Sequence, residues 1–159
     1  MFASFFLDAY AFSTEAIIGY TIGKKSKNAF LKTVTNAFQL SLFSALLISL
    51  IYLISFRYII NELTDLDYLK FLMFNYIIWI IIIPPIASIC YQFDGIFIGA
   101  SQTAEMRNAM IISVFLFISS SHFLVNNFGN HGLWLSLLFF MIMRSLTLNF
   151  YFNRILKKF

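Results

Sequence analysis

Four ionisable side chains lie inside long apolar stretches of this 159-residue chain: Asp8, Glu15, Asp94 and Arg144. A charged side chain at the centre of a bilayer costs about 2.5–3.5 kcal/mol on insertion scales, so such residues usually face other helices or a water-filled cavity. Carboxylates at that depth can bind a proton, a sodium ion or an organic cation. The chemistry that these residues predict is therefore cation binding or proton transfer within a membrane.

Asp8 and Glu15 are seven residues apart, which is about two turns of a helix, so they share one helix face. One interpretation is that this face binds a cation, a proton or a cationic substrate. The alternative is structural: one acid lies near the outer membrane interface and the other bonds a neighbouring helix.

Asp94 lies roughly 9 Å from the nearer end of its apolar stretch, at 1.5 Å per helical residue, and we therefore expect it inside the hydrocarbon core of a bilayer. Pro84-Pro85 precede it and cannot donate hydrogen bonds to the Ile80 and Ile81 carbonyls, which predicts a kinked, tilted or broken helix. Free carbonyls at this depth are tolerated only inside protein or beside water. A carboxylate on such a helix is a common coupling-ion site in transporters. Asp94 is therefore a candidate for proton or sodium coupling, and the alternative is a structural ion pair with Arg144.

Other chemistries find little support in the sequence. It contains no Ser/His/Asp arrangement, phosphate loop, CxxC or HExxH motif, and its single cysteine, Cys90, cannot form an internal disulfide. His122 and His131 fall near the ends of apolar stretches and are expected to be interfacial or loop residues. We therefore expect no enzyme, no cofactor and no metal site built from protein ligands, apart from a possible sodium ion at Asp94. The basic residues lie between apolar blocks and form no basic-aromatic patch for nucleic acid.

Aromatic and glycine residues predict further contacts within a membrane. Trp79 and Trp134 fit lipid-facing or interface anchoring. Gly95 and Gly99 have the GxxxG spacing, which favours close packing between helices.

The composition of the chain indicates what kind of structural elements position the four ionisable residues. The chain is 60% hydrophobic and 11% charged, whereas soluble domains carry about 25% charged residues. Five blocks are long enough to cross the hydrocarbon core, which takes about 20 helical residues. Their expected ranges are 2–23, 34–56, 68–100, 108–125 and 133–152. The expected fold is all-α, a polytopic membrane helix bundle of about five transmembrane helices in the lipid bilayer.

Lysine and arginine residues predict the orientation of these helices. If successive blocks alternate in direction, eight basic residues fall on one side of the membrane: Lys24, Lys25, Lys27, Lys32, Arg107, Arg154, Lys157 and Lys158. Only Arg57 and Lys70 fall on the other side. Because cytoplasmic segments carry the excess of positive charge, we expect a multi-pass protein of the inner (plasma) membrane with its N-terminus outside and its C-terminus in the cytoplasm. An outside N-terminus without a signal peptide predicts that a preceding helix is encoded elsewhere.

Three segments resemble one family of transporters. FLDAYAFSTEAIIGYTIGKKSKNAF (6–30) resembles the second helix of the C-terminal lobe in multidrug and toxin extrusion (MATE) transporters, in particular their DinF-like branch. FDGIFIGASQTAEMRNAMI (93–111) resembles the fourth helix of that lobe and the start of the fifth. NHGLWLSLLFFMIMRSL (130–146) resembles the start of the last helix. Tyr20 stands where the family usually has Gln.

The resemblance implies residues 1–159 are a partial C-terminal lobe of a twelve-helix transporter. It implies a proton- or sodium-coupled antiporter that exports small organic, often cationic, compounds. Asp94 matches an acid implicated in cation binding in sodium-coupled relatives, and Asp8 and Glu15 match acids of the DinF-like pattern. The N-terminal lobe, with the family's proton-coupling aspartate, is absent. The resemblance therefore implies a partner polypeptide that supplies this lobe, from a split or truncated gene, and no transport without it.

Two alternatives remain open at this point. A lipid-linked saccharide flippase of the same superfamily is expected to carry more basic residues in its lumen, where only Arg144 qualifies here. A non-transporting membrane assembly subunit would tolerate neutralisation of Asp8, Glu15 and Asp94.

Overall fold

A computed structural model describes residues 2–159 as five helices joined by short turns. They are α1 (Phe2–Gly23), α2 (Lys27–Leu63), α3 (Asp67–Gly99), α4 (Thr103–Phe128) and α5 (Asn130–Leu156). Within these residues there is no strand, and the all-α bundle expected from the sequence is confirmed. The four helices from α2 to α5 are long and apolar enough to cross a membrane. α1 carries both Asp8 and Glu15 and is not among them.

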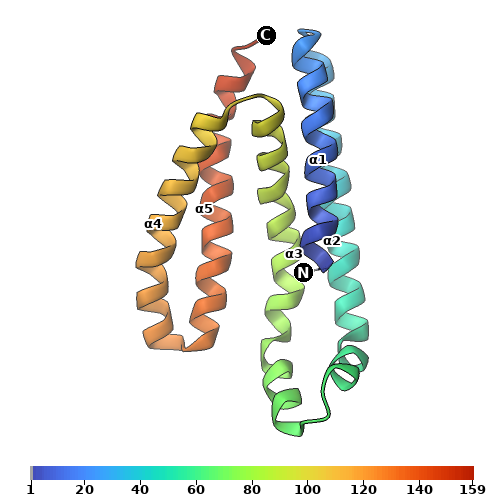
Figure 1. Cartoon of the computed structure of the whole chain (residues 1–159), viewed down its shortest axis with the longest axis vertical. Helices are drawn as coiled ribbons and strands as arrows, with labels where there is room; N and C mark the ends of the chain where they lie inside the picture. Colours follow the sequence, from blue (N-terminus) through green and yellow to red (C-terminus); the bar gives the residue numbers. More distant parts are fainter. Residues whose placement is uncertain (1) are drawn as a thin grey trace.

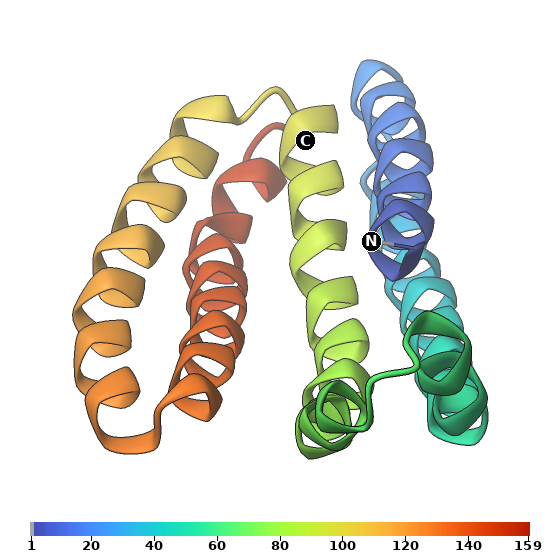
Figure 2. The same cartoon turned by 60° about the horizontal axis from the view of Figure 1, so that its bottom comes forward.

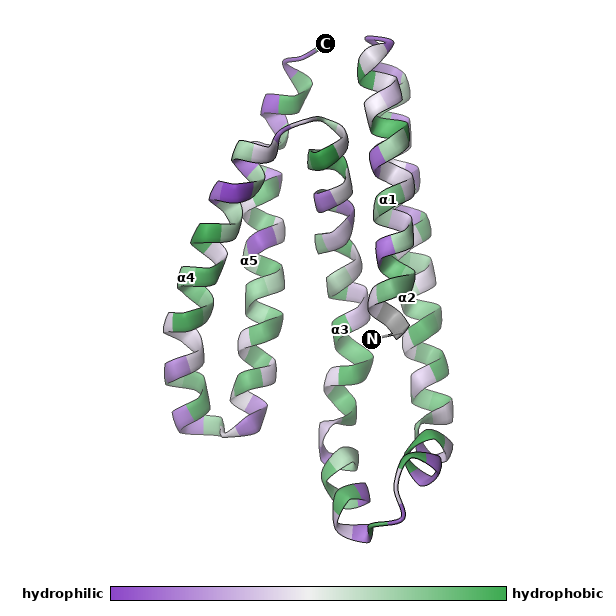
Figure 3. Ribbon diagram, in the orientation of Figure 1, coloured by the Kyte–Doolittle hydropathy of each residue, from purple (hydrophilic) through white to green (hydrophobic). Residues whose placement is uncertain are grey.

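The bundle is organised around α3, which contacts each of the other four helices. α1 and α2 pack together on one side of α3, and α4 and α5 pack together on the other (Figures 1 and 2). α1, α3 and α5 run in one direction, and α2 and α4 run in the opposite direction (Figure 1). The helices are mainly hydrophobic, with hydrophilic residues at the turns and a few hydrophilic bands within α1, α3 and α5 (Figure 3). Candidate residues on α1 and α5 can therefore approach α3 from its two sides.

Several helices extend beyond the apolar ranges expected from the sequence. The range 34–56 lies inside α2, which has 37 residues, and the range 108–125 lies inside α4. Between α4 and α5 the chain leaves the helical conformation only at Gly129, whose φ of 56° and ψ of −134° suit glycine. The hydropathy of the sequence identifies the apolar centre of each helix. It does not identify the polar residues at the ends, which are also helical.

α3 is one continuous helix through Pro84-Pro85. Of the three geometries predicted from the sequence, the broken helix is therefore excluded. Because Pro85 has no backbone N–H group, the Ile81 carbonyl lacks its usual hydrogen-bond donor within the helix. The Ser49 hydroxyl of α2 donates a hydrogen bond to this carbonyl oxygen at 2.8 Å. The expectation that a free carbonyl at this depth is satisfied inside protein is therefore confirmed at Ile81, and the bond joins α2 to α3.

Replacing Ser49 by alanine is expected to lower the free energy of unfolding by about 1–2 kcal/mol, because the partly buried Ile81 carbonyl would lose the side-chain donor that the structure gives it. Ser119→Ala is the matched control, since the exposed Ser119 hydroxyl bonds only the Phe115 carbonyl of its own helix. Thermal unfolding in detergent, followed by circular dichroism, measures both variants. Equal melting temperatures for the two would show that the Ser49 bond contributes nothing.

The C-terminal segment joins three helices at the end of the bundle where α1 ends. The Lys158 ammonium donates to the Ala100 carbonyl at 2.6 Å, which caps the C-terminus of α3. Arg154 pairs with Glu105 in the first turn of α4 at 3.1 Å. The Phe159 ring lies 5.2 Å from the ring of Phe30, which is completely buried at the start of α2. These contacts close the hydrophobic core at this end.

Candidate functional site

Glycines allow α1 to approach α3 closely. A Cβ atom at Gly95 would overlap the Ala11 carbonyl, and one at Gly99 would overlap the Glu15 carbonyl. The two helices are parallel here, because each step of four residues on α3 matches a step of four on α1. The predicted packing role of Gly95 and Gly99 is confirmed. The contact fixes the depth and rotation of α1, and with them the positions of its two acids.

Asp94 of α3 and Arg144 of α5 form an ion pair. Arg144 Nη2 lies 2.9 Å from Asp94 Oδ1, and the two side chains are 13% and 15% exposed. Despite this distance, neither Asp94 Oδ1 nor Arg144 Nε has an aligned hydrogen bond to any described residue. The Asp94–Arg144 ion pair, which the sequence left as an alternative, is therefore present. Asp94 Oδ1 and Arg144 Nε keep hydrogen-bonding capacity that no described residue uses.

Asp8 of α1 is a further acid that faces this pair. It is close enough to Asp94 and to Tyr91 to act on both electrostatically. Its side chain is only partly exposed, although no basic side chain among residues 2–159 pairs with it. Asp8 thus adds a negative charge beside an Asp94 that one arginine already neutralises.

Glu15 lies on the same helix face as Asp8, roughly 10 Å farther along α1. Its backbone contacts Gly99, near the end of α3. Within the described part of the chain it also has no basic partner. The structure therefore pairs Asp94 with Arg144, places Asp8 within electrostatic range of Asp94, and places Glu15 farther along the same flank of α1.

A buried polar contact beside this site was not predicted. The Thr14 hydroxyl of α1 donates to Gln92 Oε1 of α3 at 2.7 Å. Gln92 is completely buried, and its Nε2 atom has no hydrogen-bond partner among the described residues; the same holds for the Ser41 hydroxyl of α2. The heptad spacing of Leu7, Thr14 and Thr21, all buried, is a sequence signal for this face that could have revealed Thr14.

A second unpredicted contact joins α3 to α5 near the start of α5. The Trp79 indole donates to His131 Nδ1 at 3.0 Å, and the Tyr76 ring lies 4.7 Å from the imidazole. His131 lies in the first turn of α5, so it is not a loop residue, and it acts as a hydrogen-bond acceptor. In the residues that the structure describes, no three His, Cys, Asp or Glu side chains gather as metal ligands would. A sodium ion at Asp94 stays a prediction.

The fold and the site define the class of protein first: a polytopic α-helical membrane protein with a charged cluster between its helices. Sequence comparison shows which known protein the chain resembles. The chain is 36% identical over 147 residues to DNA damage-inducible protein F of Escherichia coli (strain K12), a member of the MATE family, and the predicted resemblance to the DinF-like branch is confirmed. The match covers 92% of the chain and 32% of the relative, so the chain spans about a third of that protein's length.

No family profile and no solved structure matches the chain. The apolar helices and the relationship to a MATE protein support a multi-pass protein of the inner membrane. Similarity to a transporter family also agrees with the expectation that the chain is not an enzyme.

Proposed function

We propose that this chain forms part of the C-terminal lobe of a cation-coupled membrane exporter of the MATE type. The observation that carries the proposal is the Asp94–Arg144 pair between α3 and α5, with the unpaired Asp8 beside it. Charged groups inside spanning helices usually face a bundle interior or a water-filled path. Such a path is where a transporter takes up its coupling ion and its substrate.

The geometry suggests how Asp94 would couple. A proton or sodium ion that binds the Asp94 carboxylate competes with Arg144 for the same oxygen atoms. The released guanidinium would then turn to another acceptor, and α5 would shift relative to α3. Asp8 favours this exchange, because its negative charge supports an additional cation near Asp94. We propose that the coupling ion is a proton or sodium and that the exported compounds are small organic molecules, often cationic.

The proposal includes a second polypeptide. The match to a third of the relative is consistent with an N-terminal lobe on another chain, which would supply the opposite wall of the transport path. The excess of basic residues at the ends of α1 and α5 supports a cytoplasmic location for those ends. Without the partner lobe we expect no transport.

A chimera tests this function directly. In it, the chain replaces the 147-residue matching segment of the E. coli relative, and efflux of an organic cationic dye is measured in proteoliposomes under an imposed proton or sodium gradient. We expect gradient-driven efflux from the chimera, loss of it in the Asp94→Asn chimera, and none from the isolated chain. Efflux that survives Asp94→Asn would support the assembly-subunit alternative, and efflux by the isolated chain would refute the need for a partner lobe.

The flippase alternative is less well supported by this geometry. Recognition of a lipid-linked phosphate needs a free basic group, whereas Arg144 is engaged by Asp94.

Neutralising the two acids of α1 should separate their roles. We expect Asp8→Asn to lower gradient-driven efflux of the chimera at least about 10-fold, because it removes the charge beside Asp94, and Glu15→Gln to have a smaller effect, because it lies roughly 10 Å away along α1. Glu105→Gln is the control, since Glu105 pairs with Arg154 at the end of the bundle, outside the charged cluster. Equal activity of Asp8→Asn and Glu105→Gln would exclude Asp8 from coupling.

A further inference from the structure

An apolar cavity lies between α2, α3 and α5, away from the charged cluster. Its volume is about 410 Å³, and its twelve lining residues come from the second half of α2, the first half of α3 and the start of α5. Tyr76, which lines it, is 18 residues before Asp94 on α3, or roughly 27 Å along the helix. The cavity is therefore separate from the proposed coupling site.

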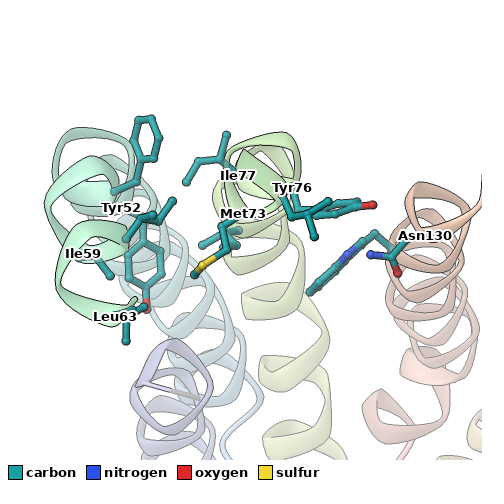
Figure 4. A pocket seen from close by; sticks show the side chains of 12 residues that line it. Tyr52, Ile59, Leu63, Met73, Tyr76, Ile77 and Asn130 are labelled. Carbon is teal, nitrogen blue, oxygen red and sulfur yellow. The ribbon is translucent and has the colours of Figure 1, made fainter. Parts of the chain in front are cut away.

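Aromatic side chains from three helices converge on this cavity. Tyr52 and Phe56 come from α2, Tyr76 from α3 and Trp134 from α5. Figure 4 shows Met73 extending from α3 toward Tyr52, and Tyr76 extending toward α5, where Asn130 lies. None of the described residues that line the cavity carries a formal charge. Recognition here would depend on ring faces, one thioether and one amide.

We propose that this cavity binds an aromatic amphiphile that enters from the membrane. Aromatic rings prefer stacked or edge-to-face partners, and a thioether contacts ring edges favourably. A flexible lipid chain gains nothing specific from four rings, whereas a planar ligand can contact Tyr76 and Trp134 together. The Asn130 amide, the single side-chain amide of the lining, then bonds one polar atom of the ligand. A cavity of this size, mostly apolar with few polar groups, is typical of small-molecule sites.

The position of the cavity supports this occupant. It lies at the end of the bundle where the α2–α3 and α4–α5 turns are found, beside the Trp79–His131 contact that ties α3 to α5. That contact holds two of the three walls at a fixed separation. Trp134 therefore belongs to a binding wall, in addition to the interface-anchoring role expected from its residue type.

Photolabelling of the full chain in lipid nanodiscs tests the site. Benzophenone is the probe, because it is an uncharged diaryl ketone that inserts into nearby C–H bonds on irradiation, and mass spectrometry locates the label. We expect saturable labelling at Met73 and adjoining lining residues. Trp134→Leu should raise the half-saturating concentration about 3- to 10-fold, through the loss of one ring contact.

Phe150→Leu is the matched control, because it removes an 82% exposed ring from the same helix outside the cavity, and it should leave labelling unchanged. Protection of the buried Cys90 from a thiol reagent verifies that each variant is folded, and Tyr52→Leu replaces Trp134→Leu if the latter is not. A cavity filled by lipid chains would give non-saturable labelling spread over exposed residues, with no difference between the Trp134 and Phe150 variants. That result would overturn the proposal.

Discussion

Replacing Gly95 by valine is expected to separate α1 from α3 and to lower the free energy of unfolding by about 3 kcal/mol or more. A Cβ atom at this position would lie 3.1 Å from the Ala11 Cα and would overlap the Ala11 carbonyl. Backbone atoms cannot move aside as a flexible side chain can, so the helices must part. Cys90, which is 2% exposed, should then react with a thiol reagent much faster than in the unmodified chain.

Gly23→Val provides the control for this prediction. Gly23 is also helical, at the end of α1, but no atom lies within 4 Å of a Cβ built there. Gly23→Val therefore makes the same glycine-to-valine change within a helix, but its side chain does not collide with a neighbouring backbone. If both variants protected Cys90 equally, the close contact between α1 and α3 would not be needed for folding.

Replacing Asp94 by asparagine is expected to lower the free energy of unfolding by about 3–5 kcal/mol, because the largely buried Arg144 would lose its counter-charge. The double variant Asp94→Asn, Arg144→Gln should regain most of that stability, since two neutral amides avoid a buried unpaired charge. Chemical unfolding of the three proteins in detergent gives the coupling energy between the two positions.

The double variant also separates stability from transport. We expect its chimera to fold and to remain unable to couple efflux to a cation gradient, because the carboxylate is absent. A coupling energy near zero between positions 94 and 144 would contradict the ion pair. Restored efflux in the double variant would contradict a direct role for Asp94.

Much of the fold follows from local patterns in the sequence. Five apolar blocks predict five helices, since each is long enough to satisfy its own backbone in lipid. The GxxxG spacing of Gly95 and Gly99 predicts a close helix contact, and the seven-residue spacing of Asp8 and Glu15 places them on one face. These features depend on residues within one helix, so a single sequence is enough to find them.

Contacts between helices depend on which helices are neighbours, and no local pattern gives that. Asp94 and Arg144 are 50 residues apart in the sequence, and their pairing is one of two alternatives for Asp94 that only the position of α5 beside α3 can decide. The same is true of Ser49 with Ile81 and of Trp79 with His131. Pro84-Pro85 predicted a free carbonyl, but only the position of α2 identifies its donor.

The hairpin of α2 and α3 projects past the α4–α5 turn (Figure 1), and Leu63 and Asp67 bound its three-residue turn. An 18.5 kDa chain buried in a micelle offers few features for aligning particle images in electron cryo-microscopy. A rigid fiducial domain grafted between these two helices would continue both of them beyond the detergent. The projecting hairpin is thus a suitable place to attach such a domain, by which these five helices could be imaged.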